Sequence, residues 1–218
     1  MTEFVKVTYT GRDKETNEIF DTNDAEEAKK AKIFTDKLSY KPLTMILGDH
    51  QLIRGFEEAL EGMKKGEKKT VEIAPEKGYG MRNPELIRIV PLKAFEKSEM
   101  MPAPGMVIQV DGSIARVQSV SSGRVRLDFN HELAGRNLVF NIEMVDKIEK
   151  EEDKLQALFE RLFPTGEKVT MNKTDKDTEV VMPAKAVKLK DYAARKVLFI
   201  QDVKKYLKID SLKVTEQY

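Results

Sequence analysis

The sequence contains no cysteine, no tryptophan and only two histidines, His50 and His131. The lack of cysteine excludes a disulfide scaffold, thiol catalysis and cysteine-ligated metal sites, and it suits a reducing compartment. Two histidines far apart in the sequence do not make an imidazole-rich metal centre. We therefore expect no metal ion and no cofactor, and we interpret both histidines as surface or loop residues.

Long apolar segments are missing as well. The longest stretch without a charged residue runs from Met100 to Val110, has 11 residues and contains two prolines. A membrane-spanning helix needs about 20 apolar residues. The N-terminal residues alternate between apolar and polar, unlike the basic region and apolar block of a secretory signal. We expect a cytoplasmic protein with no membrane partner.

Charge is abundant but balanced. The 38 basic and 37 acidic residues leave a net charge of +1. This balance removes the whole-chain electrostatic attraction that nucleic-acid binding proteins use, so we expect no nucleic-acid partner. With 40% hydrophobic residues in 218, the chain is large enough to build two or three compact domains.

The first 84 residues combine short strand patterns with one helical pattern. The Ala-, Glu- and Lys-rich segment 23–32 has the composition of a good helix former but no apolar stripe, so we interpret it as an exposed surface excursion. Gly62 is a plausible helix end. A break at Gly11 to Lys14 predicts a turn after the first strand. The predicted elements are strands at 4–9, 45–47 and 70–73, a short apolar piece at 19–20 and a helix at 52–60.

The next segment changes character. Four prolines punctuate residues 84–104, and alternation then restarts around two hairpin signals, Asp111-Gly112 and Ser122-Gly123. These signals predict strands at 108–110, 114–120 and 125–129. Because a structureless loop of roughly 50 residues is rare inside a compact domain, we expect an inserted domain here.

The remaining residues predict a further α+β unit. A strand at 138–145 leads into a charged hinge at 147–153 and a helix that Pro164 ends. The later predicted elements are strands at 168–171, 179–182 and 212–214 and a helix at 191–207. At about 65 residues this unit is marginal alone, so docking or oligomerisation would help to stabilise it.

Residues of conventional catalysis are scarce. The carboxylates from Asp21 to Glu27 have no histidine or cysteine base nearby, and clustered charges are usually a solvated face. What stands out instead is a set of apolar and aromatic residues at strand and loop junctions. They are Tyr9, Phe20-Asp21, Met45, Leu52-Ile53, Phe56, Tyr79 and Phe140.

The order of these pieces resembles the FKBP-type peptidyl-prolyl isomerases. The matching motifs are Val7-Thr8-Tyr9-Thr10-Gly11, Phe20-Asp21, Leu47-Gly48, Leu52 to Leu60, Gly62-Met63, Gly66-Glu67, Gly78-Tyr79-Gly80 and Leu138-Val139-Phe140. Residues 130–138, Asn-His-Glu-Leu-Ala-Gly-Arg-Asn-Leu, are similar to the re-entry motif of the SlyD-like branch with an inserted flap domain. The resemblance covers about residues 1–150, and the rest is similar to the long archaeal form with an extra C-terminal domain.

The resemblance implies an α+β fold with an antiparallel sheet wrapped on a short helix, an inserted small β-rich domain and a C-terminal α+β domain. The implied boundaries are 1–84 plus 133–152 for the isomerase domain, 85–132 for the inserted flap and 153–218 for the C-terminal domain. The metal-binding tail of SlyD is missing from this sequence, so its nickel role does not carry over.

The resemblance also implies the site. Its catalytic residues are Tyr9, Phe20, Asp21, Ile53, Tyr79 and Phe140, and its substrate-binding residues are Met45, Leu52 and Phe56 with Met100, Met101 and Met106 in the inserted segment. Phe56 lies where the family often has tryptophan, and Met45 replaces a frequent phenylalanine. The long segment 23–41 departs from the short family loop and leaves the local shape of the rim open.

The implied activity is cis-trans isomerisation of X-Pro bonds in unfolded or partly folded polypeptides, together with chaperone action, without a cofactor. FK506-like macrolides are a further implied ligand. Two alternatives stay open: a binding-only chaperone with a vestigial pocket, and an interaction protein that uses its basic C-terminal domain. A homodimer through that domain is a further option, with contacts from Val197, Leu198, Ile200 and Val203.

Overall fold

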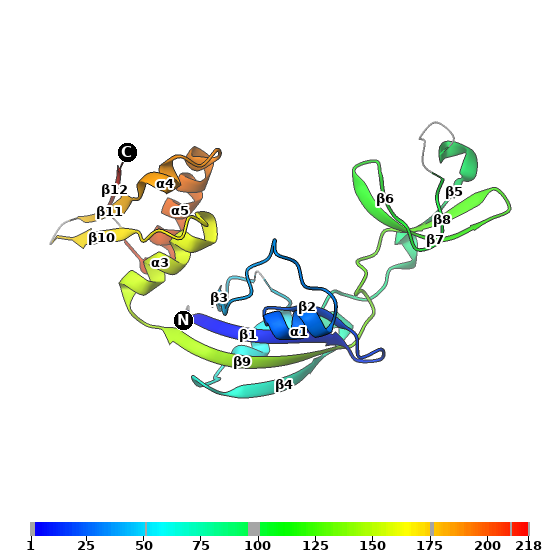
Figure 1. Cartoon of the computed structure of the whole chain (residues 1–218), viewed down its shortest axis with the longest axis horizontal. Coiled ribbons are helices and arrows are strands. Elements are labelled where there is room, and N and C mark those ends of the chain that lie inside the picture. Colours follow the sequence, from blue (N-terminus) through cyan, green and yellow to red (C-terminus); the bar gives the residue numbers. More distant parts are fainter. Residues whose placement is uncertain (1–2, 51, 96–100, 175–176, 210, 218) are drawn as a thin grey trace.

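The computed structural model describes residues 3–50, 52–95, 101–174, 177–209 and 211–217. Within them the chain forms three sheets and three clusters of buried apolar side chains, and the sheet that contains the N-terminal strand lies between the other two (Figure 1). This mixture of mainly antiparallel sheets and few helices confirms the α+β class. Among the described helices, none has the length and apolar content that a membrane crossing requires.

The central sheet is antiparallel, with the strand order β2-β1-β9-β4, and β3 also pairs with β1. Its strands are β1 (Phe4–Asp13), β2 (Ile19–Thr22), β3 (Leu43–Ile46), β4 (Lys68–Ile73) and β9 (Leu138–Ile148). The helices between them are α1 (Ala25–Lys30), α2 (Arg54–Leu60) and a 3-10 turn, η1 (Pro75–Lys77). Gly62 has a positive φ of 75° just beyond α2, as its predicted role as helix end requires.

Helix α2 packs against one face of this sheet. Phe56, Ala59 and Leu60 are buried against alternate side chains of β1 and β9. A Cβ atom on Gly55 would come within 2.6 Å of Ile73, so the glycine allows the helix to approach β4 closely. The core of the N-terminal part therefore lies between α2 and the sheet, and the candidate site lies at its edge.

The turn predicted over residues 11–14 begins only at Lys14, so its start at Gly11 is wrong. Strand β1 continues through Asp13, because its last residues pair with Leu138 to Phe140 of β9. A Cβ atom on Gly11 would come within 2.7 Å of both Phe20 and Phe140. Gly11 therefore makes room for two aromatic rings inside a continuous strand.

The inserted segment forms an antiparallel sheet in the order β5-β8-β7-β6. Both predicted hairpins are confirmed, because Asp111-Gly112 and Ser122-Gly123 have positive φ at both positions, as type I′ turns need. The elements are η2 (Pro84–Leu86), β5 (Ile87–Pro91), η3 (Leu92–Phe95), β6 (Val107–Val110), β7 (Ser113–Ser121) and β8 (Arg124–Asp128). Strand β5 was not expected from the sequence.

The C-terminal part contains a mixed three-stranded sheet that packs against helices. Strand β11 pairs antiparallel with β10 and parallel with β12. The elements are α3 (Glu151–Leu162), β10 (Thr170–Lys173), β11 (Thr178–Met182), α4 (Ala184–Val187), α5 (Tyr192–Leu207) and β12 (Leu212–Glu216). The short helix α4 was not expected, whereas the long helix near 191–207 is confirmed.

The junction between the central sheet and the C-terminal part is packed. The hinge predicted at 147–153 is wrong, because β9 continues to Ile148 and α3 begins at Glu151. Phe4 and Ile148 of the central sheet are buried in the same cluster as side chains of α3 and α5. Val203, one of the four residues expected at a homodimer contact, is fully buried in that cluster, while Val197 and Leu198 are exposed.

Candidate functional site

A small hollow of about 160 Å³ lies between α2 and the end of β1. Its lining is mainly apolar and aromatic, and comes from Tyr9, Asp21, Leu43, Leu52, Ile53, Phe56, Tyr79 and Phe140. One water molecule takes about 30 Å³ of liquid volume, so the hollow has the size of a single side chain. Seven of its eight lining residues were predicted as site residues from the sequence, and the eighth is Leu43.

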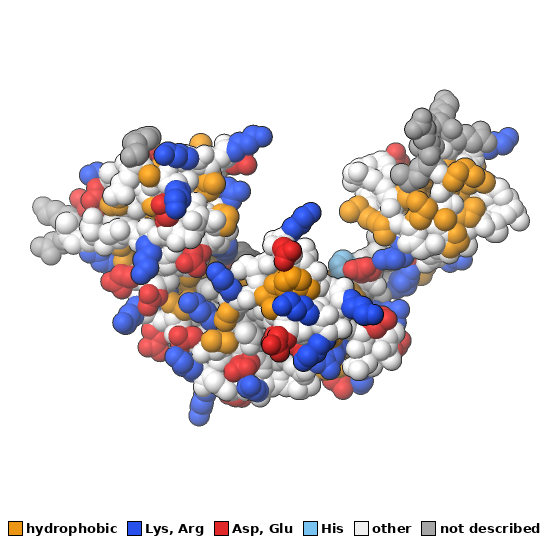
Figure 2. All heavy atoms as spheres, viewed as in Figure 1, with side chains coloured by type: hydrophobic (Ala, Val, Ile, Leu, Met, Phe, Trp, Pro, Cys, Tyr) orange, Lys and Arg blue, Asp and Glu red, His pale blue; other side chains and the backbone are white. Residues whose placement is uncertain are grey.

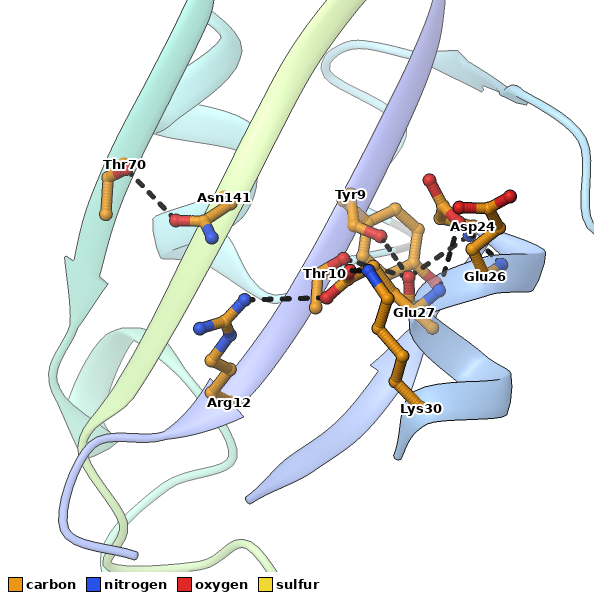
Figure 3. A network of polar contacts seen from close by, with 10 residues as sticks. Tyr9, Thr10, Arg12, Asp24, Glu26, Glu27, Lys30, Thr70 and Asn141 are labelled. Atoms are coloured by element: carbon orange, nitrogen blue, oxygen red, sulfur yellow. Dashed lines mark hydrogen bonds and ion pairs between the residues drawn. The ribbon is translucent and has the colours of Figure 1, made fainter. Parts of the chain in front are cut away.

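A larger hollow of about 390 Å³ lies on the opposite face of the sheet, but its lining is polar. Figure 3 shows the surrounding network, in which Thr70 donates a 3.0 Å hydrogen bond to Asn141 and the Arg12 guanidinium lies 3.8 Å from Glu27. Asp24 accepts hydrogen bonds from the first backbone amides of α1, which is the ordinary role of an N-cap residue. This face therefore shows a solvated network and no apolar enclosure.

Four aromatic rings brace one another around the small hollow. Phe56 and Phe140 meet edge to face with their ring centroids 5.1 Å apart. Tyr9 contacts Phe56 at 5.5 Å, and Phe20 contacts Phe140 at 5.6 Å, both again nearly perpendicular. Edge-to-face pairs are a favoured arrangement of aromatic side chains. The fold thus brings rings from β1, β2, α2 and β9 together, with Phe20 behind the wall that Phe140 forms.

The polar rim on one side consists of Tyr9 and Asp21. The Tyr9 hydroxyl donates a 2.8 Å hydrogen bond to the Asp21 carboxylate. Burial, followed by the negative charge of Asp21 and this hydrogen bond, raises the pKa of Tyr9 far above its usual value. The backbone of Tyr9 is also fixed, since its N–H donates to the Asn23 side chain at 2.7 Å. Tyr9 is therefore a neutral, oriented phenol.

Tyr79 lies on the other side of the rim, after η1. Its ring stacks on the imidazole of His131, with centroids 4.2 Å apart and planes within 4° of parallel. Burial raises the pKa of Tyr79, and the charges of Asp21 and Glu132 add to the effect. His131 lies in the segment that returns from the inserted sheet, so this contact joins that segment to the rim. Nothing in a single sequence pairs Tyr79 with His131.

Leu52 and Ile53 form the wall at the start of α2. Ile53 has extended backbone dihedrals and accepts the hydrogen bond of the Phe56 amide at 3.0 Å. Its own N–H has no hydrogen-bond partner among the residues that the structure describes. A backbone donor is thus available beside the apolar hollow.

One predicted wall residue, Met45, differs from expectation. Met45 does not line the hollow but is buried in the core, and Leu43 takes its place in the lining. Residues two apart in a strand share a face. Leu43 and Met45 therefore lie on the same side of β3, and the residue that lines the hollow is two positions before the predicted one.

The methionines of the inserted segment lie apart from the hollow. Met101 is 77% exposed, Met106 is partly exposed, and neither contributes to the lining. Met100 lies outside the described residues. Within the described ranges, no cluster of three or more histidine, aspartate or glutamate side chains could hold a metal ion.

Comparison with known proteins places these observations in a family. Residues 88–133 match the family model described as "FKBP26, IF domain". The chain is 43% identical over 144 residues to the short-type peptidyl-prolyl cis-trans isomerase of Methanocaldococcus jannaschii, an alignment that covers 66% of this chain and 90% of that protein.

Bacterial relatives cover less of this chain. A probable FKBP-type 16 kDa peptidyl-prolyl cis-trans isomerase of Pseudomonas fluorescens is 37% identical over 109 residues, or 48% of this chain and 72% of the relative. The FKBP-type isomerase SlyD of Vibrio cholerae is 39% identical over 108 residues, which cover 48% of this chain and 53% of that protein. With identities of this size over most of the first two relatives, the chain belongs to the family of FKBP-type peptidyl-prolyl cis-trans isomerases.

Proposed function

We propose that this chain isomerises X-Pro bonds of unfolded or partly folded polypeptides, with the proline ring bound in the small hollow. The observation that carries the proposal is the pair Phe56 and Phe140, whose rings meet at 5.1 Å and enclose one side of an apolar hollow of single-residue size. The volume of the hollow is below the roughly 300 Å³ at which pockets for drug-sized ligands begin, so the hollow suits one proline ring.

The mechanism follows from the bond that is turned. Peptide resonance gives a rotation barrier of about 18–20 kcal/mol. The planar amide is more charge-separated than the twisted one, so water favours the planar form. A hollow that excludes water and holds the ring removes this preference, and so it stabilises the twisted transition state relative to the planar ground state. A thousandfold acceleration needs only about 4 kcal/mol of such differential binding, without a covalent step.

The polar groups have positioning roles in this proposal. The N–H of Ile53 would donate to a substrate carbonyl, and the Tyr79 hydroxyl to the substrate backbone. Asp21 holds the Tyr9 hydroxyl at 2.8 Å and so keeps that ring in one orientation. Since rotation about the imide bond transfers no proton, the raised pKa of Tyr9 fits a structural donor and not an acid catalyst. The same hollow would accept FK506-like macrolides in competition with proline.

We further propose that the inserted sheet captures unfolded chains and delivers their prolines to the hollow. This sheet has a small core, and several of its large apolar side chains are exposed (Figure 2). They include Ile89, Met101, Val107 and Ile114. Exposed apolar groups with flexible methionines suit promiscuous binding, and tethering raises the local concentration of prolines. We treat residues 1–84 plus 133–152, 85–132 and 153–218 as the three domains that share this work.

The alternative based on a basic C-terminal surface gains little support. Several of its lysines are paired with carboxylates, which reduces the positive field available to a polyanion. The pairs are Lys185 with Glu167, Lys196 with Glu216, Lys205 with Asp49 and Lys213 with Glu179. A homodimer contact would have to use Val197 and Leu198, which are exposed on α5.

A refolding experiment tests the proposal. The full chain should accelerate the proline-limited refolding of a model protein and the isomerisation of a short proline peptide. Replacing Met101 and Ile114 by serine should lower the first rate at least fivefold and the second less than twofold. The matched control Val197→Ser removes an exposed apolar residue of α5 and should change neither. If the wild-type chain accelerates neither reaction, the isomerase proposal fails and the binding-only chaperone remains as the function. If the Met101 and Ile114 replacements lower both rates equally, the delivery role is contradicted.

A further inference from the structure

The segment between α1 and β3 carries an unusual surface. It rises between the inserted sheet and the C-terminal part (Figure 1), where Figure 2 shows hydrophobic side chains grouped among charged ones. Four large apolar residues are exposed within eleven positions: Ile33, Phe34, Leu38 and Leu43. A grouping of exposed apolar side chains in one short segment marks an interaction site more often than scattered single residues do.

This surface is held in a defined shape. The rings of Phe34 and Tyr40 stack with centroids 4.9 Å apart and planes 14° from parallel. The Tyr40 hydroxyl accepts a 3.0 Å hydrogen bond from the Thr35 amide, and the Ile33 amide donates to Ala28 at 3.0 Å. Because these contacts fix the segment from within, the stacked rings and Leu38 form a preformed platform, which we define as Ile33, Phe34, Leu38 and Tyr40. A preformed surface loses little entropy when it binds.

The segment that carries the platform also reaches the proline hollow. Leu43 is both an exposed residue of this segment and part of the lining of the hollow. Tyr40 precedes Leu43 by three residues, so their Cα atoms are at most about 11 Å apart, and Leu38 is at most about 18 Å from Leu43. An extended peptide covers these distances in about three to five residues.

Most of the charges around the platform are positive, and Asp36 is the one acidic residue of the segment between α1 and β3. Lys29 places its ammonium group 5.0 Å from the centre of the Phe34 ring, and Lys32, Lys37 and Lys41 belong to the same segment. Apolar side chains with acidic neighbours fit such a surface, whereas lysine or arginine in the ligand would meet like charges.

We propose that this platform is a second substrate subsite, which binds an apolar side chain of the unfolded polypeptide three to five residues from the proline held in the hollow. The inference rests on the proposed isomerase function and adds to it a sequence preference: apolar at the distant position, acidic rather than basic beside it. The platform would thus select prolines that are flanked by segments destined for a hydrophobic core.

The test measures kcat/KM of the full chain on octapeptides with one proline. One peptide set carries leucine four residues before or after the proline, and a matched set carries serine or lysine there. For the wild type we expect an approximately tenfold preference for leucine over serine on at least one side, and a lower rate still with lysine. Leu38→Ser should reduce this leucine-to-serine ratio to about two, and Phe34→Ala to about one. The control Val197→Ser should keep the wild-type ratio.

The outcomes separate the possible failures. A wild-type ratio near one on both sides, or a ratio unchanged in both variants, overturns the subsite. Phe34→Ala also removes the ring stack and could unfold the segment. If Phe34→Ala is poorly folded, the leucine-to-serine ratio of Leu38→Ser decides whether the subsite exists. A change of oligomeric state in Leu38→Ser with an unchanged ratio assigns the platform to a second copy of the chain. If the wild type isomerises no peptide, the proposed function fails, and fluorescence anisotropy with the same peptides still decides whether leucine is preferred in binding.

Discussion

The hydroxyl of Tyr9 donates a 2.8 Å hydrogen bond to the carboxylate of Asp21 at the mouth of the hollow. The two residues come from strands β1 and β2, which pair through Gly11 and Asp21. Sheet pairing therefore sets the distance between them, and the hydrogen bond then fixes the orientation of a ring that also contacts Phe56. The polar rim and the apolar wall are thus one structural unit.

Removal of the Asp21 carboxylate should loosen this unit. Asp21→Ala leaves the Tyr9 hydroxyl without its partner, and we expect kcat/KM for a short proline peptide to fall about tenfold. Because Asp21 is exposed, the free energy of unfolding should change by only about 1 kcal/mol or less. Peptide isomerisation and urea unfolding measured on the same preparation check both numbers. Wild-type activity in this variant would remove Asp21 from the site.

The pH profile of the reaction should be flat. The raised pKa of Tyr9 keeps its phenol protonated well above neutral pH, and imide rotation transfers no proton. We expect kcat/KM to vary less than about twofold between pH 6 and pH 9, with a solvent deuterium isotope effect close to one. A bell-shaped profile with two apparent pKa values would indicate acid–base catalysis instead.

A methyl group at Gly11 should disturb the wall. In Gly11→Ala the new Cβ would lie 2.7 Å from Phe20 and from Phe140, so at least one ring must move. Forced shifts of this kind cost about 1–3 kcal/mol of stability, and we expect a loss of activity of tenfold or more. Lys6→Ala, at an exposed position of the same strand, serves as the control and should keep both quantities. Calorimetry and the peptide assay give the comparison.

The sequence predicts the hairpin turns correctly because their backbone conformation depends on the turn residues alone. Asp111-Gly112 and Ser122-Gly123 allow positive φ at both turn positions, and both hairpins form. Gly11 was assigned to a turn because glycine often marks turns, but here the two rings that pack over it come from residues 9 and 129 positions further along the chain. Strand β5 was missed because Pro91 ends it, although a proline is tolerated at the end of an edge strand.

Asp49 joins the loop before α2 to the C-terminal part. Its carboxylate is 6% exposed and accepts hydrogen bonds from Arg161 at 3.3 Å, from Lys205 at 2.9 Å and from Tyr206. Burial alone would raise the pKa of Asp49, but these donors and the positive charges lower it below its usual value. Hydrogen bonds to a charged group contribute about 1.5–3 kcal/mol each at most sites.

The pH dependence of stability follows from this shift. The unfolded pKa of aspartate is about 3.9, and the folded pKa of Asp49 is lower, so its contribution is fully present above about pH 5 and is lost as the pH falls through the folded value. We expect Asp49→Asn to lower the free energy of unfolding by about 2 kcal/mol at pH 7 and to flatten its decline below pH 5. Urea unfolding at pH 7, 5 and 3 tests this. An equal decline in both proteins would show that Asp49 does not titrate with folding.

The predicted site residues converge because the family resemblance fixed their order, while the errors concern what surrounds them. Leu43, and not Met45, reaches the hollow, and Met45 is buried in the core instead. The stacking of His131 on Tyr79 depends on how the inserted sheet returns, which no local pattern encodes. The hinge was expected from its charges, but the pairing of Phe4 with Ile148 extends the strand through them.

The central claim is that the ring-lined hollow accelerates imide rotation, and one comparison tests it most directly. Phe140→Leu removes a ring from the hollow, and Phe159→Leu removes another buried ring, from the C-terminal cluster. For a short proline peptide, we predict that kcat/KM falls at least tenfold in folded Phe140→Leu and stays within about twofold of wild type in Phe159→Leu. Retained activity in Phe140→Leu, or the same loss in both variants, would contradict the account.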